Sequence, residues 1–230
     1  MSNIYKVREG FTLVELLVVI AASIILAGFL IPNIDNPSRS AAATGVANKA
    51  RMVVQFIVSE NIEREALSKE PIWPEYVGLD GKGGGSTAND YCAYLVEVGT
   101  GNIKPAMFAG GGVASVEDAT ELKSRGNAWC IFWGGAVGQT NAYITAGNPP
   151  FMVSRNFKRI SVTADDVLSM DDFDPNAKPF GREFVVAVFR DNTVLVSKCR
   201  NVANKEKSRF FFNYAPSGVE IAIARTADEK

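Results

Sequence analysis

The longest apolar stretch of the chain lies near its N-terminus, where the polar leader MSNIYKVREG is followed by FTLVELLVVIAASIILAGFLI, residues 11–31. An α-helix rises about 1.5 Å per residue, so this run is long enough to cross the roughly 30 Å hydrocarbon core of a bilayer. Lys6 and Arg8 precede the run. On its other side the first charged residue is Asp35, followed by Arg39. The positive-inside rule therefore places the N-terminus in the cytoplasm. The pattern predicts one transmembrane helix over 11–31 and export of the chain that follows.

An ordinary secretory signal peptide is the alternative for this segment, and it fits poorly. The apolar core of such a signal usually has roughly 7–15 residues, which is shorter than the run over 11–31. No A-x-A cleavage site follows the run neatly. The segment is therefore interpreted as an anchor.

Glu15 is a carboxylate one turn inside this otherwise uncharged apolar helix. An uncompensated ion within a membrane helix costs at least about 2.5 kcal/mol. The sequence therefore predicts that a cationic group in the membrane neutralises Glu15, such as an amine on a neighbouring subunit.

The residues around this carboxylate carry a family resemblance. Gly10-Phe11-Thr12-Leu13-Val14-Glu15, followed by a long apolar helix with Pro32 and Asn33 at its end, resembles the class III signal of type IV pilins and type II secretion pseudopilins. In that family a membrane-embedded prepilin peptidase cuts after the glycine and N-methylates the new terminal residue. The resemblance thus implies cleavage between Gly10 and Phe11, followed by methylation of Phe11.

The resemblance also implies how subunits assemble. Glu15 would face the Phe11 amine of a neighbouring subunit, where two charges that are each costly at low dielectric attract one another strongly. Pro32 stands where the family tolerates a proline at the end of the anchor. The implied partners are other pilin-like subunits or further copies of this chain in a helical filament, the prepilin peptidase, an inner-membrane assembly platform and, before assembly, the lipid bilayer.

Beyond the anchor, the pattern predicts a second helix and a linker. Pro32 and Pro37 bracket a break over 32–37, because proline lacks an N–H donor and clashes with the preceding turn. Apolar residues then recur at three- and four-residue spacing, which predicts an amphipathic helix over 38–70. A core helix of a soluble domain would show the same stripe. Prolines and a glycine-rich run predict a linker over 71–89.

Residues 90–230 form the predicted β-rich head. Short β-branched and aromatic runs bounded by turn residues predict strands, at 91–98, 128–133, 184–190, 194–198, 209–214 and 219–224. Asp191-Asn192 predicts a hairpin turn between two of them. The predicted fold class is α+β, with a long N-terminal α-helix, transmembrane and then amphipathic, packed on an antiparallel β-sheet head. The resemblance to pilins implies the same fold.

Composition narrows the function. The 230 residues include no histidine, and 24 Lys plus Arg against 25 Asp plus Glu give a net charge of −1. Without histidine the chain has no Ser-His-Asp or Cys-His pair and no His-ligated zinc, so an enzyme is not favoured. A near-zero net charge argues against nucleic acid as a partner. A basic stretch over 198–209 followed by aromatic residues is better explained by a solvated loop that leads into a buried strand.

Two further groups of residues are candidate sites. Carboxylates are concentrated over 165–174, and hard oxygen ligands in an irregular loop are what calcium prefers. The residues favoured for calcium are Asp171, Asp172 and Asp174, although EF-hand spacing is absent and a solvated acidic loop is the alternative. The three cysteines, Cys92, Cys130 and Cys199, all lie in the predicted exported head. Two of them could form a disulfide of undetermined pairing, or all three could be buried and reduced.

These observations favour a structural role. The sequence predicts a prepilin-like subunit with a leader over 1–10, held in a bacterial inner membrane with an exported head, and found in the periplasm or at the cell surface once assembled. It would form part of a type IV pilus-like filament or a type II secretion pseudopilus, with no cofactor required beyond the calcium considered above. The alternative is an exported binding protein that keeps an uncleaved N-terminal helix and forms no filament.

Overall fold

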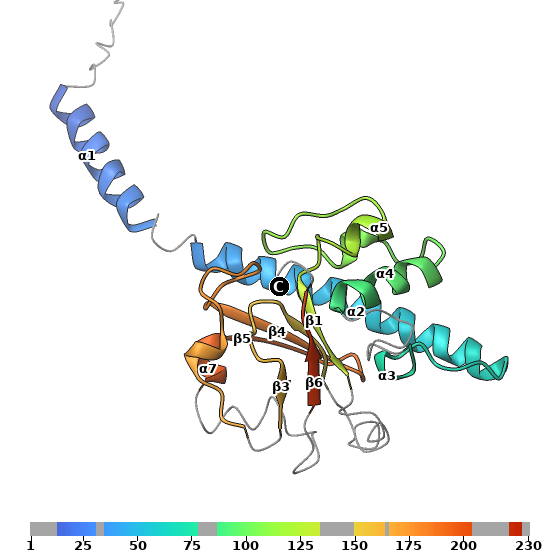
Figure 1. Ribbon diagram of the computed structural model, residues 1–230. Helices are drawn as coiled ribbons and strands as arrows, with labels where there is room; N and C mark the ends of the chain where they lie inside the picture. Colours follow the sequence, from blue (N-terminus) through green and yellow to red (C-terminus); the bar gives the residue numbers. More distant parts are fainter. Residues whose placement is uncertain are drawn as a thin grey trace, which may run out of the picture. The chain divides into compact units, whose positions relative to one another are not determined.

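The computed structural model describes residues 13–30, 35–77, 87–133, 150–163, 166–203 and 221–226 (Figure 1). The chain divides into two compact units, Met1–Arg39 and Ser40–Lys230. The first unit contains α1 (Leu13–Leu30) and the start of α2 (Asp35–Ala66). The remainder of α2 and all of the sheet belong to the second unit.

The amphipathic helix predicted over 38–70 is present as α2, with shifted ends. Pro37 lies in its first turn, where N–H groups have no intrahelical acceptor, so a proline is tolerated there. At the other end Ser68 takes a positive φ of 53° and the Lys69 N–H donates to the Arg64 carbonyl at 2.8 Å. The helix therefore ends a few residues before the predicted boundary.

The second unit is built on one six-stranded sheet in the order β3-β6-β1-β2-β4-β5, in which all neighbouring strands are antiparallel. In chain order the strands are β1 (Trp129–Trp133), β2 (Pro150–Ser154), β3 (Ser161–Val162), β4 (Phe184–Phe189), β5 (Val194–Lys198) and β6 (Ile221–Ala224). Among the described residues, the short helices of this unit are α3 (Pro74–Val77), α4 (Ala88–Val98), η2 (Pro105–Met107), α5 (Ala119–Leu122), η3 (Met170–Asp172) and α7 (Cys199–Val202). The α+β fold class predicted from the sequence is confirmed.

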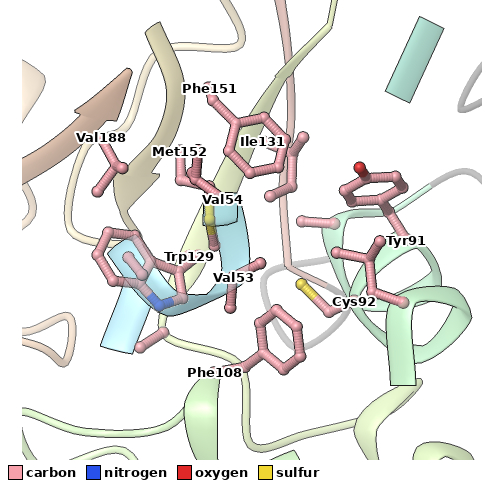
Figure 2. Packing of buried hydrophobic residues seen from close by; sticks show 14 of the residues in the cluster. Val53, Val54, Tyr91, Cys92, Phe108, Trp129, Ile131, Phe151, Met152 and Val188 are labelled. Atoms are coloured by element: carbon pink, nitrogen blue, oxygen red, sulfur yellow. The ribbon is translucent and has the colours of Figure 1, made fainter. Parts of the chain in front are cut away.

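Strands β1, β2 and β4 are buried on both faces, whereas the edge strand β5 is partly exposed. Because successive side chains of a strand point to opposite faces, Trp129 and Ile131 of β1 join one apolar cluster, whereas Cys130 and Phe132 join the other. The first cluster contains the buried stripe of α2 together with Tyr91, Cys92 and Leu95 of α4 (Figure 2). The second is closed by residues between β2 and β4 and by α7, including Phe157, Phe173 and Val202.

A register shift in β2 brings two consecutive side chains into the same cluster. The pairing of β2 with β4 is irregular between Pro150 and Met152, and a bulge of this kind redirects side chains. Phe151 and Met152 both belong to the cluster beneath α2 and α4. Phe151 there makes edge contacts with the rings of Trp73 and Tyr91, with centroid distances of 5.4 and 6.1 Å.

The structure confirms some predicted strands and corrects one. The runs predicted at 128–133, 184–190, 194–198 and 219–224 correspond to β1, β4, β5 and β6. The predicted Asp191-Asn192 turn is present, with Asn192 at a φ of 70° and the Thr193 N–H donating to the Asp191 carboxylate at 2.8 Å. The strand predicted over 91–98 is wrong, because that segment is helix α4. The strand predicted over 209–214 lies outside the described residues.

The correction at α4 has a local cause. The Thr87 hydroxyl accepts from the Asp90 N–H at 3.2 Å, and the Asp90 carboxylate accepts from the Thr87 N–H at 3.1 Å. This reciprocal capping box satisfies two N–H groups that a helix start would otherwise leave without acceptors. It therefore starts a helix at Ala88 although the following residues are rich in aromatic and apolar types.

Candidate functional site

α1 holds the described part of the predicted processing and assembly segment. Its sequence, LVELLVVIAASIILAGFL, has Glu15 and Ser23 as its polar side chains. The apolar side chains from Leu13 to Ile20 are exposed, from 78% at Leu13 to 51% at Ile20. A helix that is apolar on every side requires an apolar environment, such as packed neighbouring helices or lipid.

The two polar side chains of α1 are placed so that the helix tolerates them. Glu15 lies in the first turn, where the positive end of the helix dipole stabilises a carboxylate by about 0.3–1 kcal/mol. The Ser23 hydroxyl donates to the Val19 carbonyl at 2.8 Å, which satisfies its hydrogen-bonding capacity within the helix. Gly10, Phe11 and Pro32, the other residues of the predicted processing and assembly site, lie outside the described residues.

Among the described residues, no helix combines the length and the apolar character needed to cross a membrane. The transmembrane prediction covered residues 11–31. Its first two residues and its last one lie outside the described part of the chain.

Two of the three aspartates favoured for calcium, Asp171 and Asp172, pair with arginines. The Asp172 carboxylate accepts from the Arg159 Nε at 2.8 Å, from the Arg159 Nη2 at 3.2 Å and from the Ser169 N–H at 2.7 Å. The Asp171 carboxylate accepts from the Arg182 Nη2 at 3.2 Å. The Asp174 carboxylate accepts from the Asn176 N–H at 2.8 Å.

These contacts do not fit a calcium site. Burial alone would raise the pKa of Asp172, but the hydrogen bonds from Arg159 and Ser169 outweigh it and hold that pKa below its ordinary value. The carboxylate is therefore already neutralised by a guanidinium. Within the described ranges, no group of three or more acidic or cysteine side chains is placed to hold a metal ion. Calcium binding stays a prediction that this geometry does not favour.

The three cysteines are free thiols, and all are buried. Cys92 lies on α4, Cys130 on β1 and Cys199 at the start of α7. Burial raises the pKa of Cys92 well above its ordinary value and raises that of Cys199 to about 12. The structure thus corresponds to the reduced alternative, in which the thiols act as small apolar core groups.

The structure also joins residues that no sequence pattern connects. The Arg190 guanidinium donates two hydrogen bonds to the Glu75 carboxylate, at 2.5 and 2.6 Å. The same guanidinium carbon lies 4.6 Å from the centre of the Trp73 ring. The pair fastens α3 to the end of β4 across 115 residues of sequence, and a separation of that size has no local signal. We name Trp73, Glu75 and Arg190 the arginine clamp.

The basic stretch is only partly described. Lys198 ends β5 and Arg200 lies on α7, whereas 204–220 falls outside the described residues. The prediction that this stretch is a solvated loop is therefore not tested.

Comparison with known proteins identifies the N-terminal segment. Residues 5–31 match the family model described as the prokaryotic N-terminal methylation motif. This match confirms the resemblance of Gly10 to Glu15 to a class III prepilin signal. No curated protein and no solved structure matches the chain significantly.

Proposed function

We propose that this type IV pilin-like precursor is a structural subunit, cleaved after Gly10, N-methylated at Phe11 and assembled into a type IV pilus-like filament or a type II secretion pseudopilus. The observation that carries the proposal is the match of residues 5–31 to the N-terminal methylation motif. The resemblance to prepilins implies that the peptidase acts at Gly10 within this segment and that Phe11 receives the methyl group.

The described structure supports this function in two ways. The apolar side chains of α1 from Leu13 to Ile20 are exposed within the single chain, and lipid before assembly or neighbouring α1 helices afterwards would cover them. In the second unit, α2 buries one stripe against an antiparallel sheet, as expected for a helix that carries a head. The subunit would therefore act by assembly rather than by catalytic turnover.

Intact-mass and N-terminal analysis of the protein from native membranes and from the sheared surface fraction tests the proposal. We expect a chain that begins at Phe11 and carries one additional methyl group. A chain that begins at Met1, or one cut beyond Ile31, would contradict the proposal. Such a chain would instead fit an anchored binding protein or an ordinary secretory signal.

A Glu15→Ala variant tests the assembly contact. We expect normal membrane insertion and normal cleavage, with incorporation into filaments reduced at least about tenfold, because the Phe11 amine of a neighbour would lose the carboxylate that neutralises it. The measurement is the ratio of sheared to membrane-bound protein by immunoblot. Ser23→Ala, which removes the other polar side chain of α1 without changing its charge, is the matched control. A normal filament yield with alanine at position 15 would rule out the charge pairing.

A further inference from the structure

The outer face of α2, opposite the buried stripe, carries a regular row of uncharged side chains. The row repeats at alternating spacings of four and three residues, as in the seam of packed parallel helices, and every member is exposed. The members are Ala41, Gly45, Asn48, Met52, Gln55, Ser59 and Ile62. Met52 and Ile62 are exposed by 49% and 64%, and the space around the Cα of Gly45 is open. We name this row the α2 seam.

Two opposite charges flank the α2 seam on its two sides. Arg51 and Glu63 are both exposed, and neither takes part in an ion pair among the described residues. The Arg51 side chain reaches Asn48 at 3.5 Å. Other charges of α2 are already engaged, since Glu60 pairs with Arg64 at 2.8 Å.

Lys49, on the same flank as Glu63, is also engaged. Its Nζ donates to the carbonyls of Ala106 and Ala109 at 2.9 and 3.0 Å. Of the exposed flanking charges without an ion pair among the described residues, Arg51 and Glu63 lie on opposite flanks and carry opposite signs, whereas Glu65 lies on the same flank as Arg51.

The spacing of these charges defines a register between two parallel helices. In a parallel pair of helices packed through such seams, residue i on one flank of the first helix faces residue i+5 of the second helix. The two residues lie on opposite flanks of their own helices. For Arg51 that residue is Phe56, which packs partly against the head core. A shift of seven residues, about 10 Å along the axis, replaces Phe56 by Glu63. Arg51 then meets a carboxylate across an uncharged seam.

We propose that the α2 seam docks against a second copy of this chain, parallel and displaced by one heptad, so that Arg51 of one copy pairs with Glu63 of the next. This inference rests on the proposed function, because a shared direction of the N-terminal segments in a filament makes the helices parallel. The contact joins two different patches, so it does not close on itself and continues from copy to copy.

Cysteine crosslinking of the full chain tests this register. Positions 51 and 63 lie on one helix about 18 Å apart, far beyond the roughly 7 Å limit for a disulfide, so a disulfide between cysteines placed at these two positions must join two copies. In cells that produce Arg51→Cys/Glu63→Cys, we expect mild oxidation to give a ladder of covalent oligomers. Each single variant has no facing cysteine in this register and should stay monomeric, as should the unsubstituted chain, whose three cysteines are buried.

Charge reversal provides the second measurement. Arg51→Glu should lower the sheared filament yield severalfold, and Arg51→Glu/Glu63→Arg should restore it. Glu65→Arg, on the flank that carries Arg51, is the control and should leave the yield unchanged. An effect of Glu65→Arg as large as that of Arg51→Glu would point to antiparallel packing and overturn the proposal.

The outcomes separate this inference from the proposed function. Processed filaments that give no ladder, dimers only, or crosslinks to a different protein would overturn the seam register and leave the subunit role intact. A chain that is neither cleaved at Gly10 nor found in filaments would overturn both.

Discussion

With Gly10 replaced by leucine, most of the population of the chain is expected to keep the mass of the precursor and an N-terminus ahead of Phe11. The proposed cleavage lies directly after this glycine, within the segment that matches the N-terminal methylation motif, and a branched side chain at that position would block access of the peptidase to the backbone. We expect the processed fraction to fall from nearly all to about a tenth or less, as measured by intact mass.

Gly28→Leu is the matched control for this variant, because it adds the same side chain at a glycine of α1 far from the cleavage site. It should be processed normally. If Gly10→Leu were also cut normally after residue 10, the hypothesis that a prepilin peptidase recognises this segment through Gly10 would be wrong.

Replacing Arg190 by methionine is expected to cost more stability than removing any other single charge among the described residues. Glu75 in the arginine clamp has a side chain only 1% exposed, and that of Arg190 is 11% exposed. Removing one partner of a buried pair leaves an uncompensated charge, which typically costs about 3–5 kcal/mol. Loss of the cation–π contact with Trp73 adds to this cost. Urea unfolding of the full chain in detergent, followed by tryptophan fluorescence, measures the shift.

Two further variants give this experiment its controls. Glu75→Gln/Arg190→Met leaves no charge at the clamp and should recover part of the lost stability. Lys123→Met removes the exposed pair with Glu97, whose N–O distance is 3.2 Å, and should cost no more than about 1 kcal/mol. A cost for Arg190→Met as small as for Lys123→Met would show that the clamp contributes little to folding.

The sequence predicted those elements whose pattern is strong over a local window. The stripe on α2 is one example, since Val46, Ala50, Val53 and Ile57 are all buried against the sheet. Another is the β4–β5 hairpin, whose two β-rich runs flank the turn at Asp191-Asn192. In both cases the spacing of apolar residues and the turn chemistry agree with the tertiary environment.

The error at α4 shows how two local signals can compete. Tyr91, Cys92 and Leu95 are fully buried and follow helical spacing, but their residue types are also common in strands. The capping box of Thr87 and Asp90 is the signal that decides for a helix. It is present in the sequence and is sufficient to correct the prediction.

The acidic segment could not be interpreted from sequence for a different reason. Asp171 accepts a hydrogen bond from Arg182, 11 residues away in the sequence. Asp172 accepts one from Arg159, 13 residues away. A concentration of carboxylates looks the same in one dimension whether arginines or a metal ion neutralise it. The arginine clamp is the extreme case, because its two ends are 115 residues apart.

The strand order has a consequence for how the head matures during export. β6, the last described strand in the chain, lies between β3 and β1 and pairs with both. Until residues 221–224 have been translocated, one backbone edge of β1 therefore remains open to water or to a wrong partner. Pairing of the described sheet is completed only after residues 221–224 have joined β1 and β3. A chaperone that shields an exposed strand edge would protect the subunit during this interval, and premature truncation before Ile221 would yield an aggregation-prone product.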